Sequence, residues 1–197
     1  RNSQLEKYFQ INGEEILKQV KENKRPVIFI SGHFNNFELM AMQIEKSGIN
    51  LAAIYRPLNN IFLNKIMERI RKKHICKIQI KKGLSGTREI VQLIKKNYSI
   101  ALMIDQRVTE GTKVNFYGKP AFTTTIPAQL VKKYGLQVIP IYIERYENFH
   151  FKMIVNKPIN FDKQLSINEI TEKLNFWLEK MISKNPSQWI WTHNRWK

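Results

Sequence analysis

Residues 26–38, with the sequence PVIFISGHFNNFE, carry the pattern that decides the fold. Residues 27–30 form a short, wholly apolar run, which is typical of a strand buried in a parallel sheet. A helix is expected at 37–46, with Asn35 or Asn36 as its N-cap. A buried strand followed directly by a turn and a helix predicts the beginning of a βαβ unit.

The same alternation continues along the chain. Helical periodicity and apolar runs predict further helices at 5–20, 61–73, 84–96, 123–134 and 167–183, and further strands at 51–55, 75–80, 98–104, 137–145 and 150–155. The last two strands are expected to pair as a hairpin, and a long loop is expected at 105–122. Together these elements predict an α/β fold with a mostly parallel central sheet and helices on both faces.

Charge restricts the class of partner. The 197 residues include 33 Lys and Arg against 16 Asp and Glu, a formal net charge of +17, so we expect an anionic partner such as a membrane surface, an acidic protein or nucleic acid. The ordinary share of hydrophobic residues excludes a disordered chain. Cys76 is the single cysteine, which excludes an internal disulfide and a site with several cysteine ligands. Cys76 itself is expected to be a small core residue.

One histidine stands at a chemically useful position. His33 directly follows the apolar strand, and Glu38 comes five residues later, in the first turn of the expected helix. A carboxylate placed there can fix the tautomer of an imidazole and stabilise its protonated form. On spacing alone, the alternative is that His33 caps the helix and Glu38 is a solvated first-turn charge.

Three further segments also leave expected strands or end the chain: IYRPLNN at 54–60, MIDQ at 103–106 and PSQWIWTHNRW at 186–196. In this order, and together with HFNNFE at 33–38, they resemble the late acyltransferases of bacterial lipid A biosynthesis, the lauroyl and myristoyl acyltransferase family. The resemblance runs from about Pro26 to the C-terminus. It implies a fold like that of the glycerolphosphate acyltransferases, which share the His-x4-acid pair.

The resemblance implies a role for each matching residue. His33 would act as the general base that deprotonates an acceptor hydroxyl, and Glu38 would orient and charge-balance His33. Arg56 would meet a phosphate or a developing oxyanion, and Asp105 could position Arg56 or the acceptor hydroxyl. The expected substrate-binding residues are therefore Asn36, Tyr55, Arg56 and Asp105. In the C-terminal segment the tryptophans are expected to pack or to lie at an interface, and His193 is expected to have no catalytic role.

The resemblance also implies the partners. The acyl donor would be acyl carrier protein, the acceptor an anionic glycolipid, and the location the cytoplasmic face of the bacterial inner membrane. No metal or organic cofactor is expected, because the thioester is already activated. Residues 65–96 hold eleven Lys and Arg against two acidic residues, a local net charge of +9. That stretch could face anionic lipid headgroups, dock acyl carrier protein, or be only a solvated helix surface.

Members of this family usually carry a hydrophobic N-terminal anchor. We expect residues 1–197 to be a single acyltransferase catalytic domain, with such an anchor absent from this chain. One alternative is an acyltransferase of the same fold that acts on another phospholipid or glycolipid. A second alternative, a basic nucleic-acid-binding module, lacks any helix-turn-helix, zinc-finger or RNA-recognition signature, so no nucleic-acid partner is expected.

Overall fold

The computed structural model describes residues 7–196, apart from the side chains of residues 84 and 85. The described strands are β1 (Phe9–Asn12), β2 (Ile28–Ser31), β3 (Leu51–Tyr55), β4 (Ile78–Lys81), β5 (Ser99–Met103), β6 (Thr112–Phe116), β7 (Lys119–Thr123), β8 (Val138–Tyr146) and β9 (His150–Val155). The described helices are α2 (Glu14–Asn23), α3 (Glu38–Lys46), α4 (Ile61–His74), α5 (Leu84–Lys95), α6 (Ile126–Tyr134), α7 (Ile167–Lys184) and the short 3-10 helix η1 (Pro186–Gln188).

Seven strands form the central sheet, in the order β1-β9-β8-β2-β5-β3-β4. Every neighbouring pair is parallel except β8 and β9, which form the expected antiparallel hairpin. β2 lies at the centre, and all four of its residues are buried. Buried parallel strands are continuously apolar rather than alternating, which explains the run that precedes His33. The predicted fold class is confirmed.

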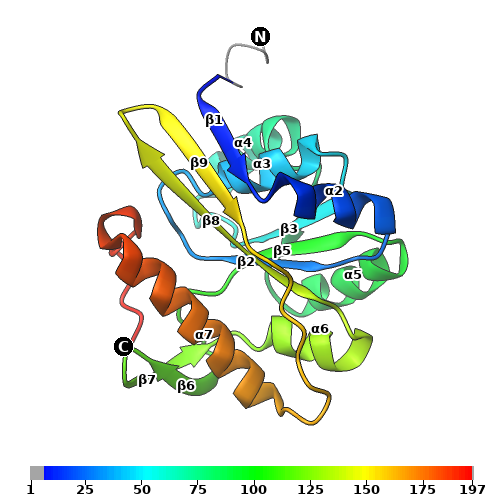
Figure 1. The fold of residues 1–197 in the computed structure, drawn as a ribbon, viewed down its shortest axis with the longest axis vertical. Helices are drawn as coiled ribbons and strands as arrows, with labels where there is room; N and C mark the ends of the chain where they lie inside the picture. The colour runs from blue at the N-terminus through cyan, green and yellow to red at the C-terminus, as the bar shows by residue number, and fades with distance from the viewer. Residues whose placement is uncertain (1–6, 197) are drawn as a thin grey trace.

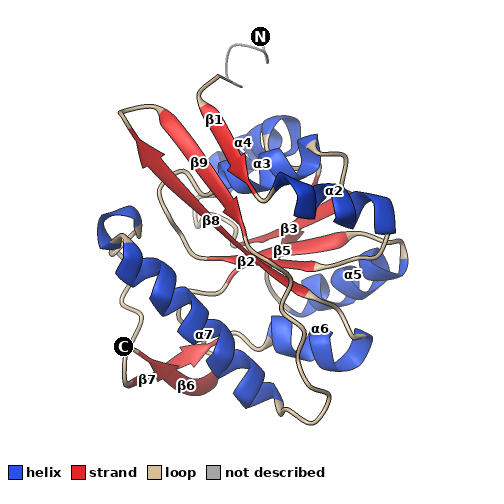
Figure 2. Cartoon of the chain, in the orientation of Figure 1, coloured by secondary structure: helices blue, strands red, loops and turns tan. Residues whose placement is uncertain are grey.

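Helices cover both faces of this sheet (Figures 1 and 2). Right-handed crossovers place α3 and α4 on one face, and α5 and α6 on the other. α7 packs against α6 and against β6, so it extends the second layer. The parallel strands β2, β3, β4 and β5 therefore all end at the same edge, where the connecting loops are free to build a site.

The N-terminal prediction is partly wrong. Residues 9–12, assigned to a helix at 5–20, form β1, which pairs in parallel with β9. Exposure alternates along β1 with a period of two, and the helix begins only at Glu14. Gly13 separates the two elements with a φ of 88°, and a Cβ there would lie 2.3 Å from the carbonyl oxygen of Val155. The start of the predicted helix, at Leu5, lies outside the described residues.

The long loop predicted at 105–122 is also wrong in part, because it contains the antiparallel hairpin β6–β7. Val114 and Phe116 alternate with exposed residues and face the interior. Tyr117 and Gly118 both have positive φ, at 52° and 72°, the conformation of a tight two-residue hairpin turn. Thr123 belongs to β7, so α6 begins at Ile126 rather than at 123.

Candidate active site

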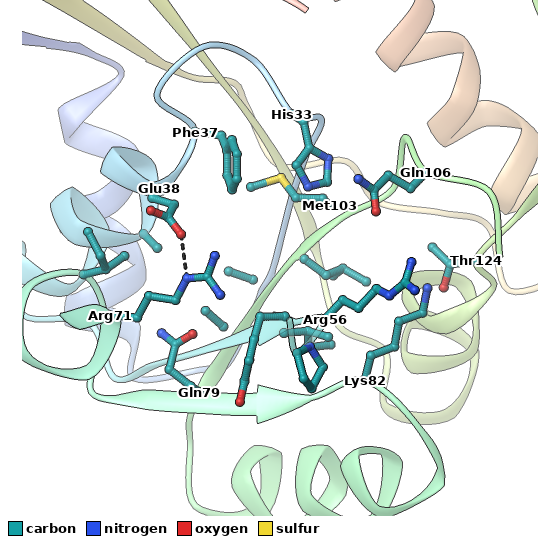
Figure 3. Close-up of a pocket in the computed structure, with 18 of the residues that line it drawn as sticks. His33, Phe37, Glu38, Arg56, Arg71, Gln79, Lys82, Met103, Gln106 and Thr124 are labelled. Atoms are coloured by element: carbon teal, nitrogen blue, oxygen red, sulfur yellow. Dashed lines mark hydrogen bonds and ion pairs between the residues drawn. The ribbon is translucent and has the colours of Figure 1, made fainter. Parts of the chain in front are cut away.

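Four neighbouring parallel strands each deliver one functional side chain at the same edge of the sheet. His33 follows β2 and Asp105 follows β5, while Arg56 follows β3 and Lys82 follows β4. His33, Arg56 and Lys82 line a cavity of about 470 Å³ (Figure 3). Asp105 is not part of the cavity wall, but it is hydrogen-bonded to His33. The strand order β2-β5-β3-β4 thus brings together residues that are far apart in sequence.

His33 and Asp105 form a hydrogen-bonded pair in which Asp105 is buried and His33 is partly buried. Oδ1 of Asp105 lies 2.7 Å from Nδ1 of His33, and Oδ2 accepts the backbone N–H of His33 at 2.7 Å. The Asp105 side chain is 3% exposed and that of His33 is 21% exposed. A carboxylate at Nδ1 favours the tautomer that carries its proton there, which leaves the Nε2 lone pair free to accept a proton. This is the arrangement that a general base requires.

The pKa of Asp105 is lowered despite its burial. Burial raises the pKa of Asp105, but hydrogen bonds from the ring and backbone of His33, the charge of His33 and a hydrogen bond from Trp189 outweigh burial and hold it below its ordinary value. The indole Nε1–H of Trp189 donates to Oδ2 at 2.8 Å. Asp105 is therefore ionised at neutral pH and can stabilise a positive charge on His33.

Gly32 allows this close approach. A Cβ at Gly32 would lie 2.9 Å from Cδ1 of Leu178 and 3.3 Å from Oδ2 of Asp105. A side chain at this position would therefore displace the side chains of Leu178 and Asp105 from the turn that carries His33.

The C-terminal segment holds the turn after β2 in place. Phe34 and Trp189 form an antiparallel bridge, and the N–H of Ile190 donates to the carbonyl of His33 at 2.9 Å. The backbone N–H of Asn35 donates to the carbonyl of Gln188 at 2.8 Å, and the Asn35 side chain also contacts that of Gln188. The prediction that Asn35 or Asn36 caps α3 is wrong, because Phe37 occupies the N-cap position and no side chain caps this helix.

Arg195 anchors the same segment from the other side. Its buried guanidinium donates to the carbonyl of Phe122 at 2.6 Å and to Oγ1 of Thr123 at 2.5 Å. Burial lowers the pKa of Arg195 to about 10, so the side chain remains charged at neutral pH. The guanidinium also lies over the ring of Phe116. The segment that positions Asp105 through Trp189 is thus fastened to the β6–β7 hairpin.

Glu38 lies in the first turn of α3, as predicted, but it does not contact His33. Its Oε1 accepts a hydrogen bond from Nε of Arg71, on α4, at 2.6 Å (Figure 3). The expectation that Glu38 orients His33 is corrected here, because Asp105 occupies Nδ1. The sheet register explains the difference: Ser31 of β2 pairs with Met103 of β5, so His33 and Asp105, each two residues further on, lie level with one another.

Arg56 and Lys82 form a cationic wall beside Thr124 (Figure 3). Neither cation takes part in an ion pair with any carboxylate among the described residues. The pKa of Lys82 is lowered, first because the cavity wall removes part of its hydration and second because Arg56 repels its charge, while Glu110 acts in the opposite direction. Two neighbouring cations without a carboxylate partner are suited to a phosphate or an oxyanion.

Tyr55 and Asn36 occupy less central positions. Tyr55 lines the cavity, but its hydroxyl donates to Glu68 and its ring lies under the guanidinium of Arg71. Burial and the Glu68 carboxylate raise the pKa of the Tyr55 hydroxyl. Asn36 is exposed in the turn before α3, where its carbonyl accepts the N–H of Leu39, and it is not part of the cavity wall.

Two further polar residues line the cavity, although neither was among the expected site residues: Gln106 lies in the quoted MIDQ segment, and His193 was expected to have no catalytic role. Nε2 of His193 accepts a hydrogen bond from the backbone N–H of Arg107 at 2.9 Å. Burial lowers the pKa of His193, although the negative charge of Asp105 acts to raise it. Gln106 extends toward the space beside His33 (Figure 3). Lys82 directly follows a strand, as Arg56 does, but it lies outside the segments that carry the family resemblance.

The rest of the cavity wall is mostly apolar. It includes Phe37, Ala41, Ile54, Leu58, Met103 and Ile126. The cavity therefore combines a base, a cationic wall and a hydrocarbon-like surface, which suits an amphiphilic ligand that carries an anionic group and an acyl chain.

The fold is that of a known class of acyltransferase. The solved 1-acyl-sn-glycerophosphate acyltransferase of Thermotoga maritima superposes with a TM-score of 0.53, covering 95% of this chain and 80% of that chain at 14% identity. At this identity the likeness shows the fold alone, and it confirms the expected glycerolphosphate-acyltransferase-like architecture.

The family itself is shown by sequence. The model of the bacterial lipid A biosynthesis acyltransferase family matches residues 1–197, so the chain belongs to this family, as its motifs predict. It is 24% identical to lipid A biosynthesis acyltransferase 2 of Shigella flexneri over 185 residues, covering 91% of this chain and 58% of that relative. It is 25% identical over 199 residues to the lipid A biosynthesis palmitoleoyltransferase of Escherichia coli, covering 100% of this chain and 64% of the relative. The chain thus spans about three fifths of the length of these curated relatives.

Proposed function

We propose that this chain catalyses O-acyl transfer from the thioester of acyl carrier protein to a hydroxyl of a lipid A precursor. The observation that carries the proposal is the His33–Asp105 pair at a cavity with one cationic and one apolar wall. Membership of the lipid A acyltransferase family supports the choice of acceptor. We further propose that residues 1–197 form one catalytic domain.

The reaction requires one proton to move twice. Nε2 of His33 accepts the proton of the acceptor hydroxyl while the oxygen attacks the thioester carbonyl and forms the new C–O bond. The tetrahedral intermediate then collapses, the C–S bond breaks, and the sulfur leaves with the proton that His33 returns. The Asp105 carboxylate stabilises the imidazolium between these two transfers, so its role is to position and charge-balance the base.

The cationic wall has the complementary task. Arg56 and Lys82 would hold a phosphate of the acceptor or the oxyanion of the intermediate. Glu38 would act indirectly, because its ion pair with Arg71 keeps that guanidinium in the cavity wall. Tyr55 would contribute its ring to the same wall. A substrate contact by Asn36 stays a prediction.

Donor and location follow from charge and family. The formal charge of +17 favours an acidic donor protein and an anionic membrane, and we propose acyl carrier protein and the cytoplasmic face of the bacterial inner membrane. The alternative acceptor is another phospholipid or glycolipid, since a solved protein of similar fold is named as acting on 1-acyl-sn-glycerophosphate.

The test is acyl transfer from lauroyl- or myristoyl-acyl carrier protein in detergent, with a lipid A precursor and a lysophospholipid as parallel acceptors. Wild type and His33→Ala are compared, and circular dichroism verifies that both are folded. Product on the lipid A precursor from wild type alone supports the proposal. Activity confined to the lysophospholipid would replace the acceptor, and equal activity of the His33→Ala variant would remove the base.

A further inference from the structure

Helix α4 is oriented with its polar side inward. The residues that are partly buried against the protein are spaced as one helical stripe, at Asn64, Met67, Glu68 and Arg71, and three of these four are polar. No residue of α4 is fully buried. A helix on a globular surface ordinarily turns its apolar stripe to the core, so the orientation of α4 is the reverse of the usual one.

Hydrogen bonds and ion pairs hold α4 in this orientation. Asn64 accepts the backbone N–H of Leu58 at 2.9 Å and donates to Glu68 at 2.7 Å. Glu68 also pairs with Lys81 at 3.2 Å, and Arg71 pairs with Glu38 at 2.6 Å. These contacts account for the inward polar groups, while all large apolar side chains of α4 other than Met67 lie on the outward side.

The outward face of α4 is strongly apolar. Its exposed large hydrophobic residues, together with Leu58 just before the helix, range from 42% exposed at Leu58 to 78% exposed at Phe62; they are Leu58, Ile61, Phe62, Leu63, Ile66 and Ile70. Phe62, Ile66 and Ile70 follow one another at intervals of four residues and so form a continuous row. A row of this size on a protein surface marks an interaction site.

Basic residues border this row. Lys65, Arg69, Lys72 and Lys73 are exposed on α4, whereas its single acidic residue, Glu68, lies on the inward side. An apolar row bordered by lysine and arginine is the signature of a helix that lies in the interface of an anionic bilayer. A second copy of this chain would bring these cations against one another, and an acidic protein surface would satisfy the cations without burying the apolar row.

Helix α4 lies beside the rim of the cavity. Leu58, Arg71 and Ile75, at or near the two ends of the helix, all line the cavity that contains His33. A bilayer in contact with the outward face would therefore meet the rim of the cavity. Within residues 7–196 no helix is long and apolar enough to cross a membrane.

We propose that the outward face of α4, defined by Leu58, Ile61, Phe62, Leu63, Ile66 and Ile70, docks on an anionic lipid bilayer. The apolar row enters the headgroup region, and the bordering cations contact lipid phosphates. This contact would hold the cavity rim against the membrane. The inference rests on the proposed function in one respect, namely that the acceptor is a lipid.

The test measures binding to vesicles, independently of catalysis. Phosphatidylcholine vesicles with and without phosphatidylglycerol are sedimented with wild type and with Phe62→Ser/Ile66→Ser. We expect wild type to bind the anionic vesicles and the double variant to bind at least about tenfold more weakly, because two exposed apolar side chains are lost. Phe176→Ser, which removes a comparably exposed aromatic residue from α7, is the matched control and should bind like wild type.

A second pair of variants tests the charges. Arg69→Gln/Lys73→Gln should weaken binding to anionic vesicles by about fivefold for each charge removed at low salt. Lys173→Gln/Lys180→Gln on α7 is the control, and its affinity should change by less. Unchanged affinity of both α4 variants would overturn the proposal. The proposal would also be overturned if the α4 variants bound vesicles normally but lost self-association or binding to acyl carrier protein.

Acyl transfer in detergent separates this proposal from the proposed function. Phe62→Ser/Ile66→Ser should keep its activity on detergent-dispersed acceptor and lose it on acceptor embedded in vesicles. Vesicle binding through α4 by a chain that transfers no acyl group would support the docking surface and reject the enzyme. Acyl transfer in detergent by a wild-type chain that binds no vesicles would support the enzyme and reject the docking surface.

Discussion

Substitution of Asp105 by Asn removes the charge that the structure places against His33. The carboxylate accepts three hydrogen bonds, two from His33 and one from Trp189, all between 2.7 and 2.8 Å. An Asn side chain has a single acceptor oxygen, so at least one of these buried donors loses its partner, at a cost of about 1.5–3 kcal/mol for each hydrogen bond to a charged group. Because the imidazolium also loses its counter-charge, we expect kcat to fall by about 10²–10⁴-fold.

The assay is acyl transfer at saturating acceptor, with the melting temperature measured in parallel so that a loss of folding is recognised. Glu38→Gln is the matched control, because it removes a carboxylate that contacts Arg71 rather than His33. We expect the control to act mainly through KM and to lower kcat by no more than about tenfold, the lower end of what one charged contact contributes. Near wild-type kcat in Asp105→Asn, with a large loss in Glu38→Gln, would refute the assignment of Asp105 as the partner of His33.

Three further predictions concern neighbouring groups. Trp189→Phe removes one hydrogen bond to Asp105 but keeps an aromatic ring, so kcat should fall by about tenfold, as measured in the same assay, while the fold remains intact by circular dichroism. Because the pKa of Lys82 is lowered, more of its amine is neutral at mildly alkaline pH. Mass spectrometry should therefore show that acetic anhydride modifies Lys82 faster than the ion-paired Lys81. Inorganic phosphate should slow the modification of Lys82, because a bound anion favours the charged amine. Folding also lowers the pKa of Asp105, so its carboxylate stabilises the fold at pH values above the unfolded-state pKa of about 3.9. This stabilisation disappears as the pH falls through the lower folded-state pKa. Urea unfolding should therefore show a steeper loss of stability in acid for wild type than for Asp105→Asn.

Much of the architecture could be predicted because strands and helices alternate strongly. The rule that ligands bind beyond the carboxyl ends of parallel strands marks the segments that hold His33, Arg56 and Asp105, and the family resemblance is what singles out Arg56 and Asp105 within them. The same rule applies to Lys82, which was missed only because no motif surrounds it. The hairpin β6–β7 was missed because its turn, Tyr117-Gly118, lacks the Asn-Gly or Asp-Gly pair that signals a two-residue hairpin in a sequence.

The partner of His33 could not be predicted, for a physical reason. Local spacing offers Glu38, but the hydrogen bond to Nδ1 depends on which strand lies beside β2. The neighbour is β5, although β3 comes first in the chain. Strand order is decided by long-range packing, which the local sequence pattern does not encode. The same holds for the hydrogen bond from Trp189 to Asp105, which joins residues 84 positions apart.

The attachment of the C-terminal segment to the turn after β2 affects how the protein acquires activity. Asn35 and Gln188 are 153 residues apart in sequence, so their contact closes a very large loop and costs more chain entropy than the contacts within each βαβ unit. During refolding the βαβ units should therefore form first, while the turn that carries His33 and the Asp105 carboxylate still lack their contacts with the C-terminal segment. We expect a refolding chain to regain its circular dichroism spectrum before it regains turnover, and the interval between the two should lengthen when Arg195 or Trp189 is replaced.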